Sequence, residues 1–224
     1  MRVARESQGR GRDNHRAVGG AMSNTGKTDP PVIGILGGIA AGKTTVARML
    51  AELGAEVVDA DKTAHEVMRA GTSIHAQIVE TFGAEVLAPN GEIDRARLGA
   101  LVFADPAALA RLEDIIHPAI LEAIRRRIAA SQAAVVAIEA IKLIEAGLAN
   151  DCDSVWVTTC RPEQQVYRII GGRGLSRAEA KQRVQAQSPQ EEKIARADVV
   201  IDTSGKLSRT WAQVQAAWQK LVGQ

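Results

Sequence analysis

The octapeptide GGIAAGKT, at residues 37–44, lies between an apolar run and a segment with helical periodicity. Residues 32–36 have the length and composition of a buried strand, and Val46, Leu50 and Leu53 recur at helical spacing. The octapeptide fits the pattern G-x-x-x-x-G-K-[ST], in which glycines let backbone N–H groups surround a phosphate at a helix N-terminus. An ordinary glycine-rich turn is the alternative, but the flanking strand and helix favour a nucleoside triphosphate site.

The pattern assigns a role to each part of this glycine-rich loop. We expect Lys43 to reach the β- and γ-phosphates of the nucleoside triphosphate and the Thr44 hydroxyl to face Mg²⁺. The residues predicted to contact the nucleotide are Gly38, Ile39, Ala40, Ala41, Gly42, Lys43, Thr44 and Thr45.

Apolar segments alternate with helical ones along the chain, which predicts an α/β fold with a parallel five-stranded sheet. The predicted strands are residues 32–36, 55–61, 133–141, 154–160 and 197–202. Two insertions interrupt the P-loop kinase domain predicted for residues 31–224, a helical one at 62–131 and a polar one at 171–196. This layout is typical of small-molecule kinases, in which such insertions bind the acceptor and form a lid. A GTPase is less well supported, because the sequence has no N/T-K-x-D element.

Local signals predict where several of the helices and turns begin and end. Residues 88–94 read as a turn, and Asp105 and Pro106 suit the first positions of a helix. We expect His117 and Pro118 to break or kink that helix, and a final helix to cover about residues 211–221.

Charge and composition narrow the class of partner. Residues 1–30 carry six basic and three acidic side chains of a chain whose net charge is +2, so the remaining residues are close to neutral. We expect this leader to be disordered, with Met22 as an alternative start. A neutral body with 3% aromatic residues favours neither nucleic-acid nor membrane binding, and two cysteines favour no disulfide framework. These features predict a cytoplasmic protein, and we favour a monomer.

Two carboxylates follow the second predicted strand, on the sheet edge that also carries the glycine-rich loop. Strand alternation would place Asp59 and Asp61 on one side, so that one acts as general base and the other supports it or binds the metal. The alternative for Asp59 is that it caps a helix starting near Lys62.

Residues 167–177 contain three arginines, the middle one flanked by glycines, and this composition predicts a loop of the lid. Arg168 and Arg173 are the arginines that we expect to contact phosphate oxygens, whereas Arg177 is a solvated residue. The alternative is a charged surface. Glu139, Lys142 and Glu145 lie at or after the third predicted strand, either near the site or on the surface.

Several longer stretches together resemble the dephospho-CoA kinase family over residues 32–205. They are IGILGGIAAGKTTVA, LGAEVVDADKTAHEV, AGTSIHAQIVETFGAEVLAPNGEIDRARLGALVFADP, HPAI, LIEAGL, RGLSRAEAKQRVQAQ and ADVVIDTSG. The resemblance implies transfer of the ATP γ-phosphate to the 3′-hydroxyl of dephospho-CoA, giving CoA and ADP. It implies Asp61 as general base, Lys43 and Thr44 for the phosphates and Mg²⁺, and Arg168 and Arg173 in the lid. The helical insertion would hold the CoA moiety.

The sequence departs from the family pattern at two positions. Lys142 lies within a stretch that usually reads P-L-L-hydrophobic-E, and Thr203 replaces a common Asn near the expected adenine site. Two other functions stay open at this point: a P-loop kinase of another nucleotide or small metabolite, and a nucleotide-binding switch without an acceptor.

Overall fold

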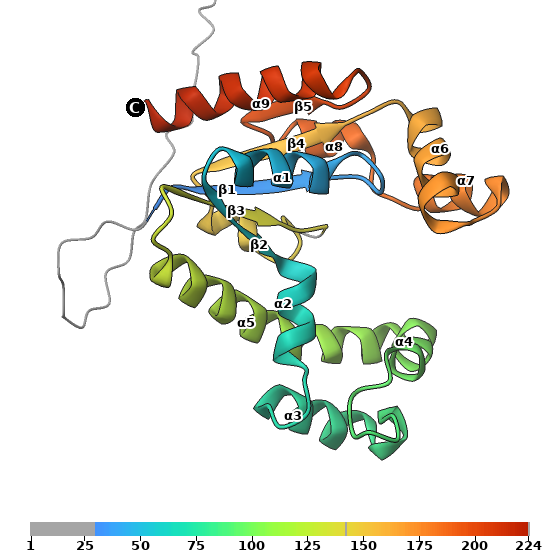
Figure 1. Cartoon of the computed structure of the whole chain (residues 1–224). Coiled ribbons are helices and arrows are strands. Elements are labelled where there is room, and N and C mark those ends of the chain that lie inside the picture. Colours follow the sequence, from blue (N-terminus) through green and yellow to red (C-terminus); the bar gives the residue numbers. More distant parts are fainter. Residues whose placement is uncertain (1–29, 142, 224) are drawn as a thin grey trace, which may run out of the picture.

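The computed structural model describes residues 30–141 and 143–223, which form an α/β fold around one parallel sheet (Figure 1). The strand order is β2-β3-β1-β4-β5, and every neighbouring pair is parallel. The predicted fold class is therefore confirmed. The strands are β1 (Val32–Gly37), β2 (Ala55–Asp59), β3 (Val135–Glu139), β4 (Ser154–Thr159) and β5 (Val199–Asp202). Residues 1–29 of the predicted leader, with Met22, lie outside the described residues.

Helices connect the strands and fill both predicted insertions. They are α1 (Lys43–Glu52), α2 (Ala60–Val67), α3 (Ser73–Phe82), α4 (Arg95–Ala104), α5 (Pro106–Ala130), α6 (Pro162–Arg173), α7 (Arg177–Gln185), α8 (Gln190–Ile194) and α9 (Leu207–Val222), with short 3₁₀ helices η1 (Ala84–Val86) and η2 (Leu148–Asp151).

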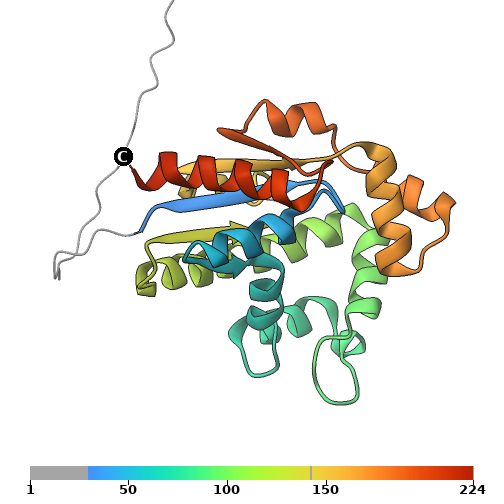
Figure 2. The same cartoon turned by 45° about the horizontal axis from the view of Figure 1, so that its top comes forward.

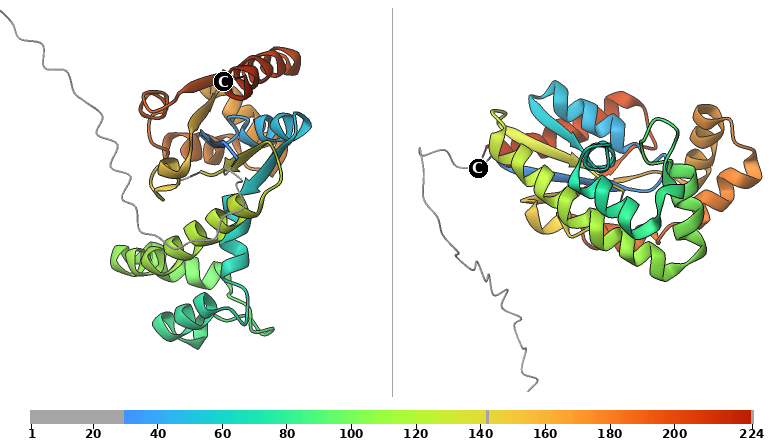
Figure 3. Two further views of the ribbon diagram at one scale, coloured as in Figure 1. Left: turned by 90° about the vertical axis from the view of Figure 1, so that its left-hand side faces the viewer. Right: turned by 90° about the horizontal axis from the view of Figure 1, so that it is seen from below.

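The central strand β1 is buried along its whole length because helices cover both faces of the sheet. Successive side chains of β1 point to opposite faces of the sheet. Ile33 and Ile35 therefore lie in a core shared with α1 and α9, and Val32 and Leu36 lie in a core shared with α5. Figure 3 (left) shows α1 and α9 on one side of the sheet and α5 on the other. The strand therefore emerges at a fixed place, with the glycine-rich loop at its carboxyl end.

The helical insertion has an apolar core of its own. Residues of α3, α4 and the first half of α5 pack together, among them Ile78, Phe82, Leu98, Val102 and Leu112. Figure 1 shows α2 leading from the sheet to this group, which lies away from the strands.

Helix α5 begins as the sequence predicts but is not broken. Asp105 accepts a hydrogen bond from the N–H of Ala107, and Pro106 occupies the first turn. The expected break at His117 and Pro118 is wrong, since the helix runs on through Pro118 to Ala130. Packing of Ile124 and Ile128 against the sheet offsets the hydrogen bond that the proline removes.

The segment expected to be an arginine-bearing loop is helical. Helix α6 continues through Gly171 and Gly172 to Arg173, and Gly174 then ends it with a left-handed conformation, φ 63°. Figure 2 shows α6 and α7 at the same end of the sheet as the glycine-rich loop.

Candidate active site

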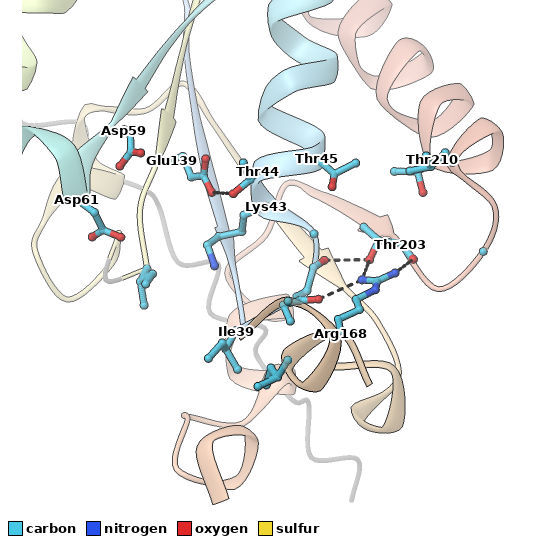
Figure 4. A pocket seen from close by; sticks show the side chains of 18 residues that line it. Ile39, Lys43, Thr44, Thr45, Asp59, Asp61, Glu139, Arg168, Thr203 and Thr210 are labelled. Carbon is cyan, nitrogen blue, oxygen red and sulfur yellow. Dashed lines mark hydrogen bonds between the residues drawn. The ribbon is translucent and has the colours of Figure 1, made fainter. Parts of the chain in front are cut away.

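A cavity of about 640 Å³ lies at the carboxyl edge of the sheet, where open α/β sheets bind ligands. It is lined by residues 39–45 of the loop region, and also by Asp59, Asp61 and Arg168. Gly38 is not part of this lining, and the side chain of Arg173 lies outside the part of the chain that the structure describes. Figure 4 shows the carboxylates on one side of Lys43 and Arg168 on the other. Most of the predicted site residues therefore converge.

The glycine-rich loop needs its glycines for different reasons. A Cβ on Gly37 would lie 2.1 Å from the Thr158 hydroxyl oxygen, so this glycine permits close packing against β4. Gly42 has φ 92° and precedes the first turn of α1 without a side chain that could accept from that turn. The N–H groups at the start of α1 are thus presented to the cavity, as an anion site requires.

Lys43 bends back over this loop. Its Nζ donates to the carbonyl oxygens of Gly37 at 2.9 Å and of Gly38 at 3.2 Å. The ammonium group therefore lies beside the loop, where it can meet phosphate oxygens.

Thr44 faces a carboxylate that our sequence analysis noted without giving it a role. The Thr44 hydroxyl donates to Glu139 Oε1 at 2.7 Å, and both side chains line the cavity. Glu139 is the last residue of β3, and its place at a strand's carboxyl end, next to β1, was the signal that could have identified it.

The two aspartates occupy different elements, which corrects the expectation that one strand carries both. Asp59 ends β2, and its Oδ1 accepts from the N–H of Lys62 at 3.0 Å as the N-cap of α2. Asp61 lies in the first turn of α2, and its side chain is exposed in the cavity. The capping alternative for Asp59 is therefore confirmed, and Asp61 is the more available carboxylate.

Arg168 bonds the backbone rather than pointing into open space. Its guanidinium donates to the Ala40 carbonyl at 3.1 Å and to the Thr203 carbonyl at 2.6 Å (Figure 4). Thr203 is buried, and its hydroxyl lies 2.9 Å from the Ala41 carbonyl oxygen. Thr203 therefore supports the glycine-rich loop, a role that sequence reasoning missed, while Lys142 lies outside the described residues.

A second cavity, of about 630 Å³, opens in the helical insertion. Apolar side chains such as Leu98 and Ile116 line it together with His65 and Arg95. Desolvation, and then the charge of Arg95, lower the pKa of His65, against the opposing charges of Asp61 and Asp59. This cavity combines an apolar wall with a few polar groups, as small-molecule sites do.

Comparison with known proteins agrees with this geometry. Residues 31–209 match the family model described as dephospho-CoA kinase. A dephospho-CoA kinase from Geobacter sulfurreducens is 47% identical over 192 residues, covering 84% of this chain and 98% of that protein. The crystal structure of TT1252 from Thermus thermophilus has a TM-score of 0.75 at 31% identity, covering 87% of this chain and 99% of that one. For a dephospho-CoA kinase from Campylobacter jejuni the TM-score is 0.65 at 26% identity, covering 86% of this chain and 97% of the other.

The matched span includes the glycine-rich loop, both aspartates, Arg168 and Thr203. It also includes all five strands and the helical insertion. With a family model matching most of its length and a relative at 47% identity, this chain belongs to the dephospho-CoA kinase family.

Proposed function

We propose that this chain transfers the γ-phosphate of ATP to the 3′-hydroxyl of dephospho-CoA, with Asp61 as the general base. The observation that carries the assignment of the base is the exposed Asp61 carboxylate in the same cavity as Lys43 and the start of α1. Phosphoryl transfer needs positioning and charge neutralisation together with a carboxylate that accepts the proton of the attacking hydroxyl.

The glycine-rich loop and Lys43 would hold the triphosphate. N–H groups at the start of α1 would bind the anion, and the Lys43 ammonium, which lies beside the loop, would compensate its charge. Lys43 then stays beside the β- and γ-oxygens while the γ-phosphoryl group moves to the acceptor.

Thr44 and Glu139 are the residues that would hold Mg²⁺. Both offer oxygen donors, the ligands that this hard cation prefers, and one or two protein ligands suffice because phosphates and water complete its shell. Asp59 remains a candidate through its second oxygen, Oδ2, which lies 3.7 Å from Lys62 Nζ. When bound, the ion neutralises charge on the phosphates.

The helical insertion would bind the rest of the acceptor, and the lid, at about residues 171–196, would close over the nucleotide. The cavity in the insertion offers an apolar surface beside Arg95 and His65, which suits a substrate that has both an apolar arm and phosphates. Asp61 and His65 both lie on α2, so the proposed base lies on the helix that leads from one cavity toward the other.

We expect a monomer that acts in the cytoplasm on small molecules. No helix in residues 30–141 or 143–223 combines the length and apolar character needed to cross a bilayer.

An acceptor screen tests the proposal. The purified protein is incubated with ATP and Mg²⁺ and either dephospho-CoA or nucleoside monophosphates, and the products are identified by mass spectrometry. We expect dephospho-CoA alone to gain one phosphoryl group. If a different acceptor were phosphorylated instead, the chain would still be a kinase, but the assignment of dephospho-CoA as its substrate would be wrong.

A further inference from the structure

The backbone of Ile39, in the glycine-rich loop, is held on both sides by side chains from distant parts of the chain. Its N–H donates to Gln187 Oε1 at 2.6 Å, and its carbonyl accepts from Gln165 Nε2 at 3.0 Å. Gln165 is a buried residue of α6, and Gln187 lies between α7 and α8. We call this arrangement the Ile39 clamp.

The next residue has an unusual backbone conformation. Ala40 has φ 55°, the only positive φ of a non-glycine residue in the described part of the chain. A Cβ disfavours this left-handed conformation, which persists only where neighbouring groups enforce it. The clamp fixes the peptide before Ala40, and Arg168 bonds its carbonyl at 3.1 Å.

Gly38 allows the two carboxamides to come this close. A Cβ on Gly38 would lie 2.8 Å from Gln165 Nε2 and 3.1 Å from Gln187 Oε1. The Gln165 amide would have to shift and the Gln187 carbonyl would have to give by a few tenths of an ångström, so both bonds to Ile39 would be strained. This packing gives a reason for a glycine at position 38, although Gly38 does not line the cavity at the sheet edge.

Gln187 also connects the loop to a helix of the lid. Its Nε2 donates to the carbonyl of Arg183, in the last turn of α7, at 3.3 Å. One carboxamide thus bridges α7 and the Ile39 N–H, so the position of α7 bears on the conformation of the loop.

We propose that Gln165 and Gln187 are positioning residues that keep Ala40 left-handed, and so direct the loop's N–H groups toward the phosphates. The inference rests on the proposed function only in treating residues 37–44 as the phosphate site. It assigns to the end of α7 a part in nucleotide affinity, although neither glutamine needs to touch the nucleotide.

The test compares Gln187→Met, which keeps the length of the side chain and removes the acceptor, with Gln185→Met on the exposed end of α7. ADP affinity is measured by calorimetry, and the KM values for ATP and dephospho-CoA by steady-state kinetics. For Gln187→Met we expect about five- to tenfold weaker ADP binding and a matching rise in the KM for ATP. The KM for dephospho-CoA should not change, and Gln185→Met should stay within about twofold of wild type.

Ala40→Gly separates positioning from a general loss of structure. Because glycine adopts the left-handed conformation freely, Gln187→Met should weaken ADP binding less in the Ala40→Gly background. An equal loss in both backgrounds, or wild-type affinity in Gln187→Met, would overturn the proposal.

Gly38→Ala provides a second route if Gln187→Met does not fold. It forces the Gln165 carboxamide to shift and crowds that of Gln187 while keeping both in the chain, so it should also weaken ADP binding, and unchanged affinity would overturn the clamp. ADP binding without phosphorylation of dephospho-CoA would instead contradict the proposed function and leave the clamp standing.

Discussion

Asp61 is the carboxylate best placed to accept a proton, since it is exposed in the cavity while Asp59 is engaged as a helix cap. Asp61→Asn removes the basic oxygen and keeps the size of the side chain. We expect kcat to fall by about 10²- to 10⁴-fold, with ADP affinity nearly unchanged. Rapid-quench measurement of CoA formation checks the rate, and calorimetry checks the affinity.

Asp59→Asn is the matched comparison, because asparagine caps a helix as well as aspartate does. A larger loss of kcat in Asp59→Asn than in Asp61→Asn would exchange the roles that we assign to the two residues.

Glu139 is proposed to hold the metal together with Thr44. In Glu139→Gln the charge is lost but a hydrogen-bond acceptor for Thr44 remains. We expect the Mg²⁺ concentration for half-maximal activity to rise about 10- to 100-fold. Titration of activity with Mg²⁺ measures this, with Glu145→Gln, an exposed residue beyond β3, as the control. An unchanged Mg²⁺ dependence would remove Glu139 from the metal site.

Both cysteines should be inert in the folded protein. Burial, then Asp151 and Asp153, raise the pKa of Cys152 to about 12, and burial raises the pKa of Cys160. Since the thiolate is the reactive form, both thiols stay protonated at pH 8. We expect iodoacetamide to leave native protein unmodified at pH 8 and to alkylate both residues in urea, as read by mass spectrometry. Rapid labelling of either native thiol would contradict this assignment.

The stability of helix α5 depends on the cap at its first turn. Asp105→Ala removes the side chain that accepts from Ala107 N–H, so we expect about 1 kcal/mol lower stability by urea denaturation. Asp114→Ala, an exposed change within the same helix, is the control. Equal effects of the two changes would show that the cap is not the cause.

Elements with strong local signals were predicted well, and those whose extent depends on packing were not. The turn at 88–94 is present, with Gly91 at φ 81°, and Pro106 starts α5. By contrast, α6 includes Gly171 and Gly172, which were expected to lie in a loop. Strand β2 ends two residues earlier than predicted. Strand β2 ends at Asp59 because this residue caps α2. The alternation of residue types does not show whether an aspartate continues a strand or caps the helix that follows it.

Nucleotide binding should stabilise the folded protein as a whole. The cavity is lined by residues of the glycine-rich loop, β2, α2, β3, α6 and the segment after β5, so a nucleotide bound there would connect several elements of the fold. At ADP concentrations 100 times Kd, mass action predicts about 2.7 kcal/mol of added stability. Thermal unfolding with and without ADP checks this, and Lys43→Ala should reduce the shift. An equal shift in Lys43→Ala would place the nucleotide away from the glycine-rich loop.

The kind of site and most of the fold could be predicted from patterns in the sequence. The glycine-rich octapeptide, the alternating apolar segments and the carboxylate pair Asp59 and Asp61 are local patterns that can be interpreted from residue type and spacing. The choice of Asp61 as the base came only from the resemblance to the family. Which groups meet at this site depends on how the chain folds. Glu139 faces Thr44 across 95 residues, and Gln187 reaches Ile39 across 148, because strand order and helix packing bring these segments to one sheet edge. Contacts of that sequence separation leave no periodic trace in the chain, so their residues become visible only once the sheet is assembled.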